Sequence, residues 1–268
     1  GGASCARAQA PMSRGSVDAA EEDVQIPVEG SWVEARVVVQ PSPVVVIALH
    51  PWGPMGGCMD DPVPRRVCQL MARAGCSTAR FNFRSGLGFG DSSIADVQAV
   101  AAWFTEREPS PGEHAPLATQ VLVVGYSYGS LIGAAAVAGI PGAIGCAVVA
   151  PPLDYGWALY LFNSGRLLAR AADSGTMPKL LMVGTEDQFC SVASFEDFLG
   201  ELPEPKKSVV LQGRDHFSLY RDVPQALTEW ITEAFGVVDL RSFSRGIVSS
   251  TATCVDAPHS ATAAGSWG

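Results

Sequence analysis

The chain has 268 residues, of which 47% are apolar and 17% charged, which suits one large α/β domain and argues against a disordered chain. Its formal net charge is −9 and it has no run of Lys or Arg, so neither nucleic acid nor an anionic membrane surface is expected as a partner. No stretch approaches ~18 consecutive apolar residues, so no membrane span is expected.

Strand-like and helix-like segments alternate along most of the chain. The run 44–49 is wholly apolar, as strands buried on both faces of a sheet are. The alternation predicts a mainly parallel sheet with helices on both faces, in which ligands bind at the carboxyl ends of the strands. The predicted strands are 33–39, 44–49, 77–83, 121–124, 146–150, 180–183 and 208–211, and the predicted helices are 64–74, 94–107, 130–138, 191–199 and 223–235.

Three segments do not follow the alternation. Residues 1–24 are expected to form a flexible N-terminal segment, and residues 237–268 a low-complexity C-terminal tail, because the latter is rich in Ser, Thr, Ala and Gly. The α/β domain is therefore predicted over 25–236. Within it, the segment 152–178 is interpreted as a small cap over the site, with an ordinary packed helix as the alternative.

Cysteine content and the N-terminus bear on the cellular compartment. The seven cysteines include no C-x-x-C, which predicts free buried thiols in a reducing compartment and no zinc site. Residues 1–17 contain arginine but no acidic residue, which weakly resembles an organellar transit peptide, with a plain flexible N-terminus as the alternative. An intracellular location, cytoplasmic or organellar, is expected, and a protein partner could bind through the terminal segments.

The most informative motif is Gly125-Tyr126-Ser127-Tyr128-Gly129, a G-x-S-x-G between a strand pattern and a small-residue helix pattern. In that context the motif predicts a nucleophile elbow, a sharp turn that presents the serine hydroxyl at the end of a strand and in front of a helix. The turn is tight, so both flanking positions need to be nearly free of side chain. Ser127 is therefore the predicted nucleophile.

A serine hydroxyl is a weak nucleophile that needs a base, and the base needs an acid to orient it. Asp187 and His216 each follow a predicted strand, so both are expected at the same sheet edge as Ser127. The other histidines are less well placed, because they lie before the motif, in a polar loop and in the tail. They are His50, His114 and His259.

Two other carboxylates compete for the role of the acid. Glu186 directly precedes Asp187 and follows the same predicted strand. Asp215 is a weaker candidate because it directly precedes His216, and the side chain of an adjacent residue rarely points at the imidazole. Asp187 is the predicted acid.

An oxyanion hole needs two backbone N–H donors near the nucleophile. Tyr128 is expected to supply one, because it directly follows Ser127. The loop after the strand 44–49 is expected to supply the other, and there Pro51 lacks an N–H, so Trp52 is the candidate. A plain Gly/Pro loop is the alternative, and His50 is interpreted as a residue that orders this loop.

Three sequences resemble motifs of the α/β-hydrolase superfamily, over residues 28 to 236. They are His50-Pro51-Trp52-Gly53-Pro54-Met55-Gly56-Gly57, Arg80-Phe81-Asn82-Phe83-Arg84 and Asp215-His216-Phe217. Within the superfamily they are similar to small serine esterases of the dienelactone-hydrolase kind.

The resemblance implies that Ser127, Asp187 and His216 are nucleophile, acid and base, and that Tyr128 and Trp52 form the oxyanion hole. Two features depart from the group, since Ser85 stands at a usual glycine position and the stretch 86–94 is short. Arg84 is interpreted as a structural ion-pair partner and not as a substrate ligand.

The resemblance and the motifs predict the α/β-hydrolase fold and a serine hydrolase that cleaves a carboxylic ester or thioester of a small acyl molecule through an acyl-enzyme. No metal or other cofactor is expected. Trp157, Tyr160 and Phe162 are the predicted substrate-pocket residues and suggest an apolar or aromatic acyl group. The alternatives are a catalytically silent module in a larger assembly, since this fold hosts many functions, and a hydrolase that acts on peptides.

Overall fold

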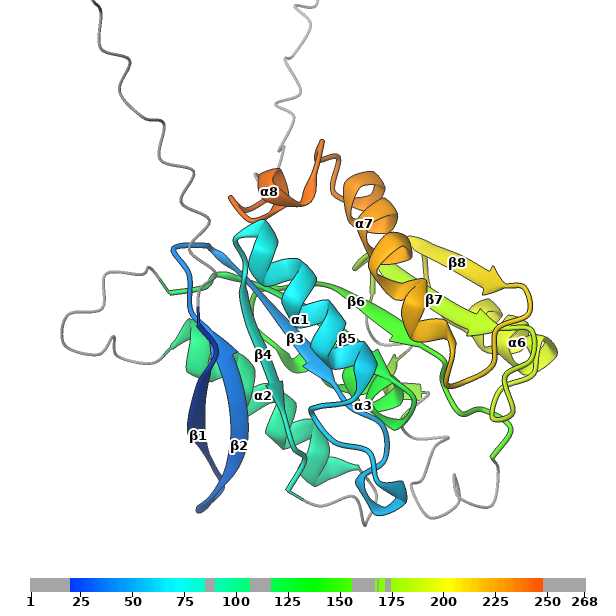
Figure 1. The fold of residues 1–268 in the computed structure, drawn as a ribbon, viewed down its shortest axis with the longest axis horizontal. Coiled ribbons are helices and arrows are strands. Elements are labelled where there is room, and N and C mark those ends of the chain that lie inside the picture. The colour runs from blue at the N-terminus through cyan, green and yellow to red at the C-terminus, as the bar shows by residue number, and fades with distance from the viewer. Residues whose placement is uncertain are drawn as a thin grey trace, which may run out of the picture.

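The computed structural model describes residues 20–84, 90–106, 117–155, 167, 169–171 and 175–247. These residues form an eight-stranded sheet in the order β1-β2-β4-β3-β5-β6-β7-β8 (Figure 1). β1 and β4 pair antiparallel with β2, and all the remaining pairs are parallel. The strands are β1 (Glu22–Val28), β2 (Ser31–Val38), β3 (Val44–Leu49), β4 (Ser77–Phe81), β5 (Gln120–Tyr126), β6 (Ala143–Val149), β7 (Lys179–Gly184) and β8 (Lys206–Leu211).

Helices cover both faces of this sheet, which confirms the predicted architecture. One face packs against α1, α7 and α8, and the opposite face packs against α2, α3 and α6. Figure 1 shows α1 and α7 in front of the strands. The helices are α1 (Pro62–Ala74), α2 (Asp91–Thr105), α3 (Tyr128–Ala136), α6 (Val192–Glu201), α7 (Val223–Ala234) and the short α8 (Leu240–Phe243).

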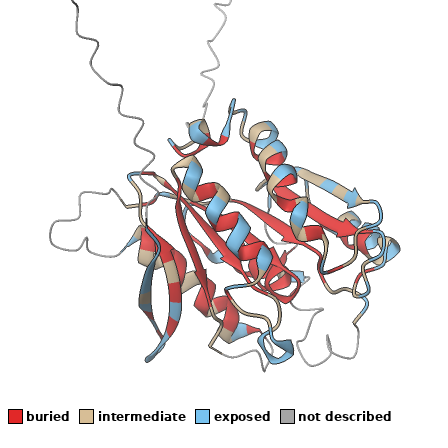
Figure 2. Cartoon of the chain, viewed as in Figure 1, coloured by how far each residue is buried: buried red, intermediate tan, exposed pale blue. Residues whose placement is uncertain are grey.

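The uninterrupted apolar sequence of β3 follows from its position between two layers of helices. Val45, Ile47 and Leu49 join the hydrophobic cluster on the α2/α3 side of the sheet. The alternate residues of the same strand join the cluster on the α1/α7 side. A strand between two helical layers is buried on both faces, so its hydrophobic residues are continuous and not alternating. Figure 2 shows this buried centre in red.

The folded domain begins earlier than predicted, inside the segment 1–24. β1 starts at Glu22 and pairs along its whole length with β2. Only Ile26 and Val28 of this edge strand are buried, so most of its residues are polar or exposed. Its sequence therefore gives only a weak indication of a strand. Glu21, just before the strand, forms an ion pair with the buried Arg80 (2.7 Å between Oε2 and Nη2).

The folded domain also ends later than predicted, because residues 237–247 pack on the sheet and helices. Phe243 of α8 is fully buried and its ring lies 5.3 Å from that of Phe235. The Gln120 side chain donates to the Ile247 carbonyl and accepts from its N–H, both at 2.8 Å. One buried aromatic ring and hydrogen bonds from a side chain to the backbone of Ile247 therefore hold a segment whose small-residue composition predicted a tail. The remainder of that predicted tail lies outside the described residues.

The predicted cap at 152–178 also lies largely outside the described residues. Within the described ranges, no helix combines the length and the apolar character that crossing a bilayer requires.

Candidate active site

Ser127 occupies a strained turn between β5 and α3. Its backbone has φ 54° and ψ −122°, in the left-handed half of conformational space that non-glycine residues rarely enter. A Cβ on Gly125 would overlap the carbonyl oxygen of Gly129, and a Cβ on Gly129 would lie 2.5 Å from the carbonyl oxygen of His50. Glycine is therefore needed on both sides of Ser127, and the strand–turn–helix context predicted for the motif is present.

Asp187 and His216 are brought together by the loops that follow β7 and β8. The Nδ1 atom of His216 lies 2.9 Å and 3.0 Å from the two carboxylate oxygens of Asp187, whose side chain is fully buried. The backbone N–H of Phe189 donates to Asp187 Oδ1 at 2.8 Å and fixes the carboxylate. With its Nδ1–H directed at the carboxylate, the neutral ring has Nε2 as its acceptor.

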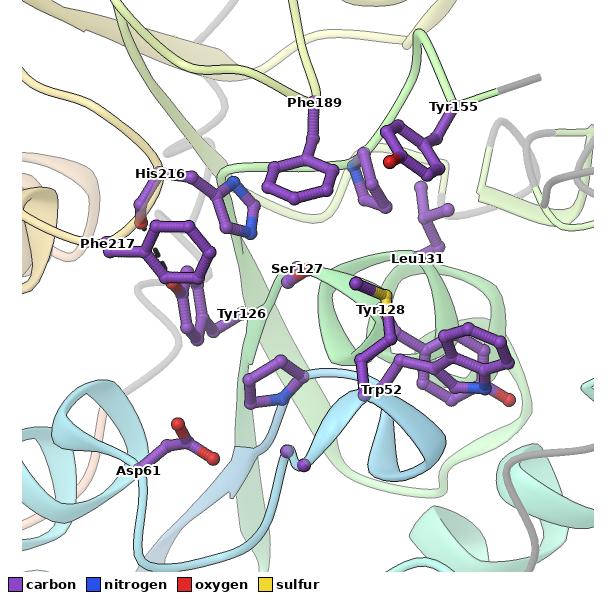
Figure 3. Close-up of a pocket in the computed structure, with 15 residues that line it drawn as sticks. Trp52, Asp61, Tyr126, Ser127, Tyr128, Leu131, Tyr155, Phe189, His216 and Phe217 are labelled. Atoms are coloured by element: carbon purple, nitrogen blue, oxygen red, sulfur yellow. Dashed lines mark hydrogen bonds between the residues drawn. The ribbon is translucent and has the colours of Figure 1, made fainter. Parts of the chain in front are cut away.

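The predicted nucleophile and the predicted base share one pocket. Ser127 and His216 both line it, and Figure 3 shows the His216 ring pointing toward Ser127. The pocket measures ≈ 870 Å³ including space open to solvent. Its described lining is Pro51, Trp52, Met55, Gly56, Gly57, Asp61, Tyr126, Ser127, Tyr128, Leu131, Pro152, Tyr155, Phe189, His216 and Phe217.

The two rival carboxylates are engaged or directed elsewhere. Asp215 Oδ1 accepts from the backbone N–H groups of Phe217 (3.1 Å) and Ser218 (2.6 Å), and these hydrogen bonds lower the pKa of Asp215. Glu186 is exposed and meets the histidine loop through its backbone N–H, which donates to Arg214 O at 2.9 Å. The choice of Asp187 over both agrees with this geometry.

Aromatic side chains enclose the His216 ring. Tyr126 stacks on it with ring centres 5.2 Å apart, and its hydroxyl donates to the His216 carbonyl at 2.8 Å. Phe189 lies 4.5 Å away in a tilted contact, and Phe217 lies 5.3 Å away edge-on. The rings restrict the imidazole to one orientation and shield it from water. Phe189 is not among the site residues predicted from the sequence. Its position two residues after Asp187 is the signal that could have identified it.

The loop expected to supply an oxyanion donor is tied down by His50. The His50 Nδ1–H donates to Pro51 O at 2.5 Å, and Nε2 accepts from the Phe83 backbone N–H at 3.1 Å. Both nitrogens are used in a neutral ring, and burial lowers the pKa of His50 to about 4. These contacts agree with the interpretation of His50 as a residue that orders the loop.

The two predicted oxyanion donors line the same pocket as Ser127. Trp52 and Tyr128 both line the pocket next to Ser127 (Figure 3). The Trp52 carbonyl accepts from the N–H groups of Met55 and Gly57, each at 3.1 Å, so the loop turns tightly after Trp52. Their role as oxyanion donors stays a prediction.

The segment from Arg80 to Arg84 supports the site without lining it. Arg80 is buried and donates to the Met59 carbonyl at 3.1 Å, while the Asn82 side chain accepts from the Met59 N–H at 2.9 Å. Arg84 pairs with the fully buried Asp96, with Nε and Oδ1 2.5 Å apart. The interpretation of Arg84 as a structural ion-pair partner agrees with these contacts.

The predicted pocket residues Trp157, Tyr160 and Phe162 lie outside the described residues. The described lining includes Leu131 and Tyr155, which come from α3 and from the loop after β6. Leu131 lies four residues after Ser127, one helical turn along α3, so helical spacing from the nucleophile could have identified it.

No cluster of three or more His, Cys, Asp or Glu that could hold a metal occurs among the residues that the structure describes. Five cysteines lie in the described ranges, all of them free, and all but Cys58 are buried. Burial raises the pKa of Cys68, Cys76, Cys146 and Cys190 to about 12, which keeps these thiols protonated and unreactive.

Comparison with known proteins defines the fold. No family model and no curated protein matches this sequence. Solved structures that match include an α/β serine hydrolase without lid from Xanthomonas campestris (TM-score 0.62, 20% identity, covering 80% of this chain and 94% of that one). An esterase from Pyrococcus furiosus matches with TM-score 0.66 and 16% identity, covering 85% and 98%. An α/β serine hydrolase homologue from Coxiella burnetii matches with TM-score 0.61 and 22% identity, covering 77% and 95%.

The strand order, the elbow and these similarities agree, and the chain has the α/β-hydrolase fold. The expected fold is thereby confirmed.

Proposed function

We propose that this protein is a serine hydrolase that cleaves a carboxylic ester or thioester through an acyl-enzyme. One observation carries the proposal: the strained Ser127 shares a pocket with His216, whose Nδ1 is held by the buried carboxylate of Asp187. An oriented imidazole with Nε2 free to accept a proton is what a serine hydroxyl needs to become a nucleophile.

The proposed reaction uses each group in turn. Ser127 Oγ attacks the carbonyl carbon while His216 Nε2 takes the hydroxyl proton, and Asp187 stabilises the resulting imidazolium. The backbone N–H groups of Tyr128 and Trp52 stabilise the oxyanion. The tetrahedral intermediate then expels the alcohol or thiol, which receives the proton from His216. Water, activated by the same imidazole, attacks the acyl-enzyme, releases the carboxylic acid and restores Ser127.

The pocket and the similar structures support a small acyl substrate. Apolar and aromatic side chains dominate the described lining, as in sites that bind apolar ligands. Among the similar structures, one from Pyrococcus furiosus is named an esterase. The silent-module alternative is less favoured, because its expected sign is a missing member of the Ser–Asp–His set, and the sequence contains all three residues.

A fluorophosphonate probe tests this proposal, because it forms a bond only with an activated serine. The purified chain is expected to be labelled, and the Ser127→Ala and His216→Ala variants are expected to show no labelling while keeping the wild-type circular dichroism spectrum. Failure of the folded wild-type chain to react would contradict the proposal and favour a binding or structural role.

A further inference from the structure

A single carboxylate stands in the wall of the apolar pocket. Asp61 is the only Asp or Glu among the described lining residues, and the proposed reaction does not use it. Figure 3 shows its side chain on the same side of Ser127 as Tyr126 and Phe217, whereas Leu131, Trp52 and Tyr155 lie on the other side.

The conformation of Asp61 is not explained by the helix that follows it. Asp61 is the N-cap residue of α1, yet its side chain accepts no capping hydrogen bond. Pro64 stands at the third position of the helix, so one of the two usual capping donors is missing. The carboxylate instead turns back, and its Oδ2 accepts from the Cys58 backbone N–H at 2.6 Å.

No cation of the described chain pairs with Asp61, in contrast with its neighbour. Asp60 lies between Arg36, at 2.7 Å, and Arg80. Among the described residues Asp61 forms no salt bridge, and the hydrogen-bond partner of its carboxylate is Cys58. Burial raises the pKa of Asp61, while hydrogen bonds from Cys58 oppose that change. A half-buried carboxylate without a counter-ion gains most when a ligand supplies one.

The position of Asp61 assigns it to one part of the substrate. The imidazole that takes the proton from Ser127 must pass it to the departing oxygen or sulfur, so the leaving group lies on the His216 side. Tyr126 stacks on His216, and the charge of Asp61, with those of Asp187 and Asp215, adds to burial in raising the pKa of Tyr126. Asp61 therefore lies near the leaving-group side, and Leu131 and Tyr155 near the acyl side.

We infer that Asp61 is a specificity-determining residue that favours esters whose leaving alcohol carries a positive charge, such as an amino or quaternary ammonium alcohol. This inference rests on the proposed hydrolase function. The carboxylate supplies the counter-charge, and the aromatic rings of Tyr126 and Phe217 offer π faces that attract a cation. The formal net charge of −9 further favours the approach of cationic substrates.

A pair of isosteric esters tests the inference. Choline esters and 3,3-dimethylbutyl esters of the same acyl group differ only in a quaternary nitrogen replaced by carbon, so their ratio of kcat/KM isolates the charge. Acid release at constant pH reports both, with acetyl, butyryl and benzoyl groups. We expect the wild-type chain to prefer the choline ester about tenfold, the size of one well-placed charge interaction. The Asp61→Asn variant keeps an acceptor for Cys58 and should lower this ratio to about one, because kcat/KM for the choline ester falls toward that for the neutral ester.

The control is Glu22→Gln, which removes the same charge from the exposed edge strand β1 and should leave the tenfold preference intact. Fluorophosphonate labelling of Ser127 in each variant separates the two proposals, because it reports an activated serine whatever the leaving group. A labelled enzyme that hydrolyses both esters equally well, or that does not hydrolyse choline esters, would overturn the inference and leave the proposed function standing. Absence of labelling in the folded wild-type chain would overturn both.

Discussion

Gly184 and Arg214 are in direct backbone contact, because a Cβ on Gly184 would overlap the Arg214 carbonyl oxygen. The same oxygen accepts a hydrogen bond from the Glu186 N–H at 2.9 Å. Gly184 ends β7 shortly before Asp187, and Arg214 lies two residues before His216. This contact therefore sets the distance between the acid and the base.

Replacing Gly184 with alanine should separate the two loops. The added methyl group meets backbone, which cannot rotate away, so we expect a loss of roughly 2 kcal/mol in the free energy of unfolding. The rate of fluorophosphonate labelling of Ser127 should also fall, because the acid and the base are moved apart. Gly200→Ala is the matched control, since a Cβ there meets nothing within 4 Å and lies in α6. It should stabilise the protein by about 0.5 kcal/mol. Unchanged labelling in Gly184→Ala would show that the contact does not position the pair.

Three carboxylate variants test which acid orients the base. Asp187→Asn should slow probe labelling on the order of 10⁴-fold, because an amide cannot hold the Nδ1–H tautomer of His216. Glu186→Gln and Asp215→Asn should label within about twofold of the wild type, since neither side chain contacts the imidazole in the structure. A larger loss in either of these than in Asp187→Asn would assign the acid elsewhere.

We expect the burial of His50 to make the free energy of unfolding depend on pH. Its pKa is about 4 in the folded protein against 6.5 for an unperturbed histidine, because burial disfavours the charged ring. Between these values the unfolded chain binds a proton that the folded chain does not, so stability falls as the pH falls from 6.5 toward 4. The difference amounts to roughly 3 kcal/mol. Urea unfolding across pH 4 to 8 should show this slope in the wild type.

The His50→Gln variant is the comparison for that measurement. It cannot titrate in this range, so its stability should vary less between pH 4 and 6.5, although it will be lower overall because one of the two loop hydrogen bonds is lost. Equal pH dependence in the two proteins would mean that His50 titrates normally.

Arg84 should contribute to stability and not to catalysis. Arg84→Met leaves the Asp96 carboxylate buried without its partner, which we expect to cost about 3 kcal/mol. At a temperature where the variant is folded, its labelling rate should equal that of the wild type. The control Arg36→Met removes an arginine whose side chain is 34% exposed, and should cost less than about 1 kcal/mol. A variant of Arg84 that is stable but slow to label would instead make Arg84 a substrate ligand.

The features predicted well from the sequence are those with a strong local signal. Gly125 and Gly129 mark the elbow because a turn this tight has no room for a Cβ, and that constraint is visible in five consecutive residues. Asp187 and His216 could be placed because parallel strands end at one edge of the sheet, so chain order and strand ends together define their location.

Features that depend on tertiary contacts could not be predicted in this way. β1 is an edge strand with two buried residues, and α8 is held mainly by Phe243, so neither shows a clear period in the sequence. Asp61 lines the pocket because its side chain turns back to accept from Cys58 and does not cap the helix. Its sequence context is that of an ordinary helix N-cap.

The central claim is that acyl transfer passes through Ser127, and direct detection of the acyl-enzyme tests it. The enzyme would be mixed with p-nitrophenyl acetate, quenched in acid within the first turnover, digested and analysed by mass spectrometry. We predict an acetyl group on the peptide that contains Ser127, and neither adduct nor turnover in Ser127→Ala. Hydrolysis by Ser127→Ala at the wild-type rate, or an acetyl group on another residue during turnover, would contradict the account.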